Sequence, residues 1–73
     1  MTPSEKLRLI QKPYLNVSEI ARLLSVSRGA VYRGVKSIKK YPPFGYCTDD
    51  IILQFRLKGA IKRWETYAKE VEA

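Results

Sequence analysis

Basic side chains dominate the middle of this 73-residue chain. Between Ile20 and Thr48 no acidic residue occurs, whereas six basic residues do: Arg22, Arg28, Arg33, Lys36, Lys39 and Lys40. A guanidinium group can donate two parallel hydrogen bonds to a phosphate or to O6 and N7 of guanine, and an ammonium group binds phosphate as a point charge. Arginine and lysine at this density indicate a polyanionic ligand.

The charge of the whole chain points the same way. Fourteen Lys and Arg against seven Asp and Glu give a net charge of +7. The partner of so basic a domain is most often nucleic acid and less often an anionic membrane surface. A solvated basic face that serves solubility is the alternative, but the concentration of basic residues around one predicted helix favours a ligand.

Catalytic and metal-binding chemistry lacks its usual residues. The chain has no histidine and a single cysteine, Cys47, so neither the common zinc-ligand spacings nor an intrachain disulfide can be built. The carboxylate pair Asp49-Asp50 has no metal-ligand partner nearby, and Cys47 has no base beside it. We therefore expect no enzyme activity and no cofactor.

No apolar run approaches the roughly 20 residues that a membrane span requires. The first ten residues, MTPSEKLRLI, also lack the apolar core of a signal peptide. We therefore expect a cytoplasmic protein without a membrane partner.

The basic residues fall on one side of a predicted helix over Ser27–Lys39, which Ser27 caps. At about 100° per residue, one arc holds Arg28, Gly29, Tyr32, Arg33, Lys36, Lys39 and Lys40. The other arc holds Ala30, Val31, Gly34, Val35 and Ile38. The second arc is expected to face the core, with Gly34 allowing another element to approach closely. Gly29 either lets the backbone approach a ligand or is tolerated near the helix end.

A second helix precedes this one and shares its core. Asn16 and Glu19 form a capping-box signature, and an apolar stripe of Ile20, Leu23 and Leu24 follows. The turn Ser25–Ser27 separates the two helices, so residues 16–40 are predicted to form a helix-turn-helix. In that motif Ala21 lies where the helices cross, Val26 fills the turn, Val31 points into the core, and Ser25 replaces the usual glycine of the turn.

Helices are also predicted at both ends of the chain. Thr2, Pro3 and Glu5 are typical of a helix start, and Pro13 ends this N-terminal helix, so it falls within residues 1–12. Residues 58–73 are amphipathic at helical spacing, and Trp64 is expected to contribute most to the core.

Residues 44–57 permit two interpretations. Ile51, Leu53, Phe55 and Leu57 alternate with polar residues, which favours a strand paired with Phe44–Cys47 across a turn at Thr48–Asp50. The competing interpretation is one long helix from Thr48, supported by the stripe Leu53, Leu57, Ala60, Trp64, Tyr67 and Val71. We favour the hairpin, which gives a mainly α fold with a small β-hairpin: helix, helix-turn-helix, two-stranded wing and C-terminal helix in one domain.

This order of elements carries a family resemblance. YLNVSEIARLLSVSRGAVYR from Tyr14, the pair Pro42-Pro43, and FRLKGAIKRW from Phe55 resemble the excisionase, AlpA and MerR-type winged helix-turn-helix families. Small phage excisionases of the Cox type, which also act as repressors, match the size and charge best. One departure is Gly34, where these families often place a large aromatic residue.

The resemblance implies a sequence-specific double-stranded DNA-binding protein of a phage or mobile element, acting as an excisionase, a transcriptional repressor or both, with an integrase as a further partner. The Ser27–Lys39 helix would enter the major groove, and the wing would lie near the adjacent minor groove. The residues expected to contact DNA are Ser27, Arg28, Gly29, Tyr32, Arg33, Lys36, Lys39 and Lys40. Arg28 and Arg33 suit base readout, whereas the three lysines suit phosphate contact.

A different class of function competes with this one. The protein could be a small accessory subunit that binds single-stranded DNA or a protein partner in a replication complex. Its five candidate stacking residues are Tyr14, Tyr32, Tyr41, Phe44 and Tyr46. Comparing duplex with single-stranded probes at matched salt distinguishes the two classes.

One domain of this size is expected to bury roughly 600–1,000 Å² on DNA, which gives modest affinity. We therefore expect a monomer or weakly associated protein in solution that assembles cooperatively on direct repeats. The predicted contacts join the acidic C-terminal residues Glu65, Glu70 and Glu72 head-to-tail to a neighbour's basic surface.

Overall fold

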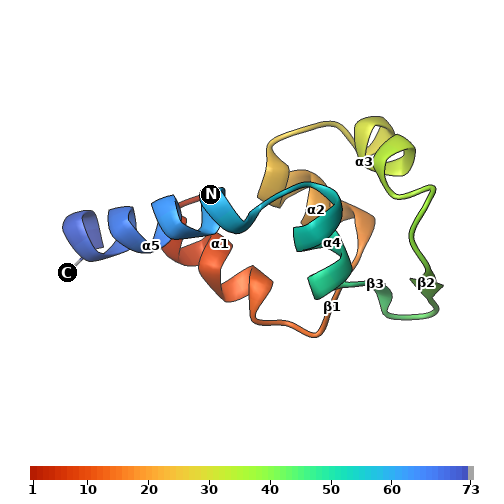
Figure 1. The fold of residues 1–73 in the computed structure, drawn as a ribbon, viewed down its shortest axis with the longest axis horizontal. Helices are drawn as coiled ribbons and strands as arrows, with labels where there is room; N and C mark the ends of the chain where they lie inside the picture. The colour runs from red at the N-terminus through yellow and green to blue at the C-terminus, as the bar shows by residue number, and fades with distance from the viewer. Residues whose placement is uncertain (73) are drawn as a thin grey trace.

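The chain is mainly helical and carries one small antiparallel sheet (Figure 1). The computed structural model describes the backbone of residues 1–72 and the side chains of residues 1–70. Its elements follow in the order α1 (Pro3–Ile10), β1 (Tyr14–Leu15), α2 (Val17–Leu24), α3 (Arg28–Gly34), β2 (Lys40–Tyr41), β3 (Gly45–Cys47), α4 (Thr48–Gln54) and α5 (Lys58–Glu72). In Figure 1, α3 and the β2–β3 hairpin lie at one end of the 36 Å long axis and α5 lies at the other.

The first three helices begin where local capping signals predict. The Thr2 side chain accepts a hydrogen bond from Glu5 N, and the Ser27 side chain accepts one from Ala30 N. Asn16 and Glu19 form the complete, reciprocal capping box. Side-chain oxygens thus satisfy amide groups that have no partner within each helix.

The sheet has the strand order β1-β3-β2, with both pairs antiparallel. Tyr14 pairs with Cys47 and Tyr41 pairs with Gly45, and residues 42–44 connect β2 to β3. Gly45 has φ +113°, and a Cβ at this position would overlap the carbonyl oxygen of Leu15. Only glycine therefore lets β1 lie this close to the central strand.

The prediction of a hairpin over residues 44–57 is wrong in its second strand. The observed hairpin lies earlier, at Lys40–Cys47, and Ile51–Gln54 belong to helix α4. The central strand β3 already has a partner on each side, so residues 51–57 could not pair with it as predicted. At the start of α4, Thr48 N donates to Pro13 O at 3.1 Å, and the Thr48 hydroxyl donates to Lys12 O.

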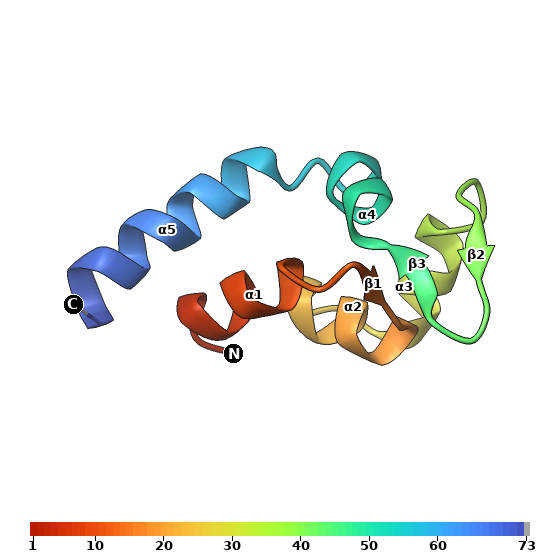
Figure 2. The same cartoon turned by 90° about the horizontal axis from the view of Figure 1, so that it is seen from below.

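The competing interpretation, a single helix from Thr48, is correct about where the helix begins and wrong about its continuity. Helix α4 ends at Gln54, and α5 begins at Lys58. Between them Arg56 adopts a left-handed backbone conformation with φ 54°, which breaks the helix and turns the chain. Figure 2 shows the resulting change of direction between α4 and α5.

The predicted length of the third helix is also wrong, because α3 ends at Gly34 and not at Lys39. The carbonyl of Gly34 accepts a hydrogen bond from Gln54 Nε2 at 3.0 Å, and Ile38 N donates to Val35 O. Continuing the helix to Lys39 would require Ile38 N to donate to Gly34 O, but each of these groups has another partner. A contact from α4, distant in sequence, thus accompanies the end of the helix.

The centre of the core is formed by Leu15, Ile20, Leu23, Val31 and Ile51, each at most 1% exposed. The inward position of Val31 is therefore confirmed. Trp64, expected as the main core residue, is only half-buried: it packs at the edge of the core on α5, with Lys6 Nζ 5.2 Å from its ring centroid. Val26 does not fill the turn, because 43% of it is exposed.

Candidate nucleic-acid interface

Helix α3 presents a basic surface on the side opposite its core residue. Val31 and Val35 are buried, whereas Arg28, Tyr32 and Arg33 are exposed. The arrangement follows from helical spacing, since residues 28 and 32 lie one turn apart on one face. The division into a core arc and a basic arc, predicted from the sequence, is therefore confirmed for the residues within α3.

The hairpin brings a third basic group to this surface. A hollow of about 360 Å³ lies between the start of α2, helix α3 and the hairpin. Its lining is Asn16, Val17, Ser18, Arg28, Tyr32, Lys40, Pro42, Pro43, Gly45 and Tyr46. Three predicted site residues, Arg28, Tyr32 and Lys40, thus border one hollow, which we call the hairpin hollow.

The remaining predicted residues lie in different surroundings. Arg33 is on the exposed face of α3, and its Nη1 would be 3.7 Å from a Cβ built at Gly29, so its guanidinium lies beside the first turn. Lys36 is exposed in the turn that follows α3. The hydroxyl of Ser27 accepts the capping hydrogen bond from Ala30 N.

Lys39 lies beside an aromatic ring of the hairpin. Its Nζ lies over the ring of Tyr41, 4.9 Å from the centroid. Because helix α3 ends at Gly34, the arc calculated for a longer helix does not apply to residues 35–40. Neighbouring Lys39 and Lys40 therefore point to different surroundings, one to an aromatic ring and one to the hairpin hollow.

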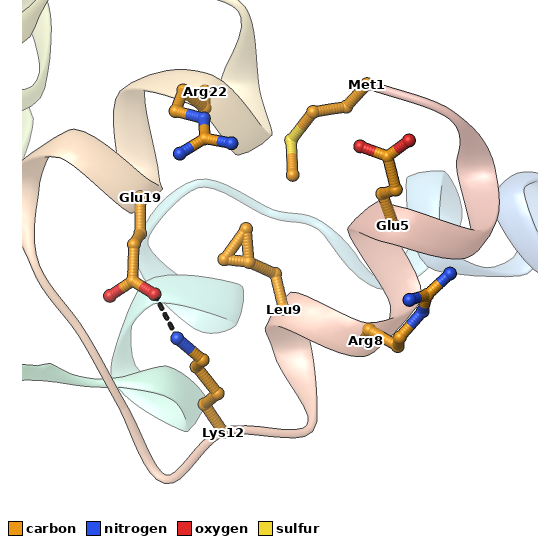
Figure 3. Close-up of a pocket in the computed structure, with 7 residues that line it drawn as sticks. All are labelled: Met1, Glu5, Arg8, Leu9, Lys12, Glu19 and Arg22. Carbon is orange, nitrogen blue, oxygen red and sulfur yellow. Dashed lines mark hydrogen bonds and ion pairs between the residues drawn. The ribbon is translucent and has the colours of Figure 1, made fainter.

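Glu19 directly follows Ser18 of the hairpin hollow, but its carboxylate forms an ion pair with Lys12, which does not line that hollow. Glu19 Oε2 pairs with Lys12 Nζ at 2.5 Å, on the border of a second hollow of about 280 Å³ between α1 and α2 (Figure 3). Burial raises the pKa of Glu19, but hydrogen bonds from Lys12 and Asn16 and the charges of Lys12 and Arg22 lower it by more, so the pKa is below its usual 4.5. The second hollow thus combines two acidic with three basic side chains, whereas the charged residues that line the hairpin hollow are both basic.

Sequence reasoning did not foresee that the start of α2 and Lys40 would border the same hollow as Arg28 and Tyr32. This proximity depends on β2 pairing with β3 and on β3 pairing with β1 just before α2. The available signal was the segment KKYPPFGYC, in which a proline pair separates two short runs that contain aromatic residues.

Metal and membrane sites are not found in the described part of the chain. Among those residues no group of three or more His, Cys, Asp or Glu side chains could hold a metal ion. In the same residues no helix has the length and apolar character needed to cross a membrane.

Comparison of the chain with protein-family models, curated proteins and solved structures gives no significant match. The function is therefore inferred from the residues and their geometry.

Proposed function

We propose that the protein is a winged helix-turn-helix domain that binds double-stranded DNA sequence-specifically through α3. The observation that supports this best is the convergence of Arg28, Tyr32 and Lys40 on the hairpin hollow, beside the exposed Arg33. B-DNA offers a major groove that admits an α-helix, and arginine is the residue that most often reads guanine there. The helix pair α2–α3 and the adjacent hairpin supply the corresponding elements.

Within this proposal the basic residues have two roles. Arg28 and Arg33, on the exposed face of α3, contact base edges, and Tyr32 packs against a thymine methyl group or a phosphate. Lys40 on the hairpin and Lys36 after α3 contact phosphates, which fix orientation without carrying sequence information. Gly29 has no side chain, so the backbone of the first turn of α3 can approach the DNA closely.

The biological role in the proposal is that of a phage or mobile-element protein in the cytoplasm, which acts as an excisionase, a repressor or both. Such a role requires several copies on DNA, because one domain buries too little surface for high occupancy. For head-to-tail contact, the α3 surface at one end of the molecule would meet Glu65 and Glu70, which lie exposed on α5 at the other end among Lys62, Arg63 and Lys69. The Glu72 and Val71 side chains lie outside the described residues.

The experiment begins with selection of preferred sites from a random duplex pool at fixed salt. On the selected site, Arg28→Ala or Arg33→Ala should cost about 1–3 kcal/mol and relax preference at one base position. Lys40→Ala should weaken all duplexes alike and lower the magnitude of the salt slope by about 0.9.

Lys69→Ala on α5 is the matched control, because it removes the same charge far from α3. Equal losses for Arg28→Ala, Lys40→Ala and Lys69→Ala, independent of sequence, would show that binding is only electrostatic and would contradict the proposal.

A further inference from the structure

The two faces of the small sheet carry different side chains. Paired residues in an antiparallel sheet project to the same face, and successive residues project to opposite faces. Leu15, Tyr46 and Lys40 therefore share one face, on which Leu15 and Tyr46 are buried in the core. Tyr14 and Tyr41 share the other, which we call the outer sheet face.

Three aromatic rings lie together on the outer sheet face. The ring centroids of Tyr14 and Tyr41 are 5.6 Å apart at an interplanar angle of 54°, although their strands flank β3 from opposite sides. Phe44, at the end of the hairpin loop, stacks on Tyr14 with a centroid distance of 5.3 Å and an interplanar angle of 24°. Phe44 nevertheless remains 61% exposed, so much of its surface is open to solvent.

The charge beside these rings is positive. Lys39 Nζ lies 4.9 Å from the Tyr41 centroid, and no acidic residue occurs from Ile20 to Thr48. The next acids in sequence, Asp49 and Asp50, follow β3 at the end opposite to Phe44. An exposed ring held by its neighbours and accompanied by an ammonium group suits a ligand that combines a flat aromatic surface with negative charge.

We propose that the outer sheet face is a stacking platform for the unpaired bases of single-stranded DNA, separate from the surface of α3. A base stacks on the open surface of Phe44, and Lys39 binds an adjoining phosphate. Every base has a π-face, so such a platform tolerates different sequences. The choice of DNA over RNA rests on the proposed function of α3, whereas the platform itself rests only on the rings and Lys39.

The test measures anisotropy of a labelled ten-nucleotide oligo-dT at fixed salt, with an oligo-U of equal length in parallel. Phe44→Ala should weaken oligo-dT binding about 5- to 150-fold, the range expected from loss of one base stack. The salt slope should stay unchanged, because no charge is removed. Phe44→Leu should bind as weakly as Phe44→Ala, since it keeps apolar bulk without a ring.

Leu53→Ala is the matched control, because Leu53 is also apolar and is 70% exposed, on α4. It should leave oligo-dT binding unchanged, and Phe44→Ala should leave duplex binding unchanged. The platform would be overturned if Phe44→Ala bound oligo-dT with wild-type affinity. It would also be overturned if this variant lost oligo-dT binding and duplex binding equally. Binding of oligo-U without oligo-dT would overturn the assignment to DNA.

The two proposals can fail separately. If Phe44→Ala leaves oligo-dT binding unchanged while the protein binds its duplex specifically, only this inference is contradicted. Loss of specific duplex binding with Phe44-dependent oligo-dT binding intact contradicts only the proposed function of α3.

Discussion

Glu19 connects the start of α2 to the segment that follows α1 through its carboxylate. Oε2 accepts a hydrogen bond from Lys12 Nζ at 2.5 Å, and Oε1 accepts one from Asn16 N at 3.0 Å. Its pKa is lowered because these hydrogen bonds and the charges of Lys12 and Arg22 outweigh the burial that raises it. The ionised form is therefore favoured in the folded state, and protonation should weaken the ion pair between α2 and Lys12, which follows α1.

We predict that Glu19→Gln lowers the free energy of unfolding at pH 7 by about 0.5–1 kcal/mol, since glutamine can still complete the capping box but carries no charge. A lowered folded-state pKa contributes stability above the unfolded value, near 4.5, and that stability is lost as pH falls through the folded value. Urea denaturation should thus show a larger difference at pH 7 than at pH 3.

Glu65→Gln changes the net charge equally on the exposed surface of α5 and serves as control. A Glu19→Gln effect that is the same at pH 3 and pH 7 would contradict the charge-based explanation.

Ser25 adopts a conformation that normally favours glycine, with φ 57° and ψ 45° at the end of α2. The left-handed region costs a non-glycine residue roughly 1–2 kcal/mol. We predict that Ser25→Gly raises the free energy of unfolding by about 0.5–1 kcal/mol, measured by urea denaturation, because part of that gain is offset by the greater freedom of glycine in the unfolded chain.

Ser37→Gly is the matched control in an exposed turn where φ is not positive. It should be neutral or destabilising. Destabilisation by Ser25→Gly to the same extent as by Ser37→Gly would show that the turn gains nothing from glycine.

At the scale of elements, α3 meets the α4–α5 connection through Gly34. A Cβ built at Gly34 would lie 2.5 Å from Cζ of Phe55, which confirms the predicted close approach at this glycine. Gly29 on the same helix has no such neighbour, since the nearest atoms to its Cβ position are 3.7 and 3.9 Å away. The two glycines therefore have opposite expected responses to substitution.

We predict that Gly34→Ala destabilises the fold by about 1–3 kcal/mol, the usual cost of overpacking, and that adding Phe55→Leu removes much of that cost. Gly29→Ala should instead stabilise by about 0.5–1 kcal/mol through helix propensity. A double-mutant cycle from thermal or urea unfolding measures the coupling. Additive effects of Gly34→Ala and Phe55→Leu would mean that the two residues do not press on each other.

Local signals predicted the elements that depend on neighbouring residues, and non-local pairing decided the rest. The starts of α1, α2 and α3 follow from caps at Thr2, Asn16 and Ser27, which lie next to the helices they begin. The register of β3 depends on Tyr14, more than 30 positions away in sequence. Apolar and polar residues alternate over residues 51–57 as in a strand, but the same sequence is compatible with a helix that buries Ile51 and exposes Leu53.

The candidate site was likewise predictable only where it depends on local helical spacing. The exposed face of α3 follows from helical spacing, so the exposure of Arg28, Tyr32 and Arg33 could be predicted. The different positions of Lys39 and Lys40 could not, because they depend on the hydrogen bond from Gln54 to the end of α3 and on the pairing of β2. Both are contacts between residues distant in the sequence.

At the scale of the whole molecule, α5 extends away from the end that carries α3 (Figure 2). Its exposed acids Glu65 and Glu70 alternate with Lys62, Arg63 and Lys69, so α5 has no purely acidic face. Contacts with a neighbour on DNA would then use individual ion pairs, which are weak in free solution.

We predict that the protein sediments mainly as a monomer without DNA and binds tandem direct repeats with higher affinity per site than a single site. Glu65→Gln combined with Glu70→Gln should reduce this cooperativity and leave single-site affinity unchanged or slightly higher, because two repulsive charges are removed. A tight two-fold dimer in solution that prefers a palindrome would contradict head-to-tail assembly.

The most direct test of the central claim, that α3 and Lys40 form the duplex-binding surface, is backbone amide chemical-shift mapping with a selected duplex. The account predicts the largest changes at residues 27–33 and at Lys40, with smaller changes at the start of α2 around the hairpin hollow. Residues 58–70 of α5 should be nearly unaffected on a single site. Changes concentrated on α5, or confined to the outer sheet face at Tyr14, Tyr41 and Phe44, would contradict it.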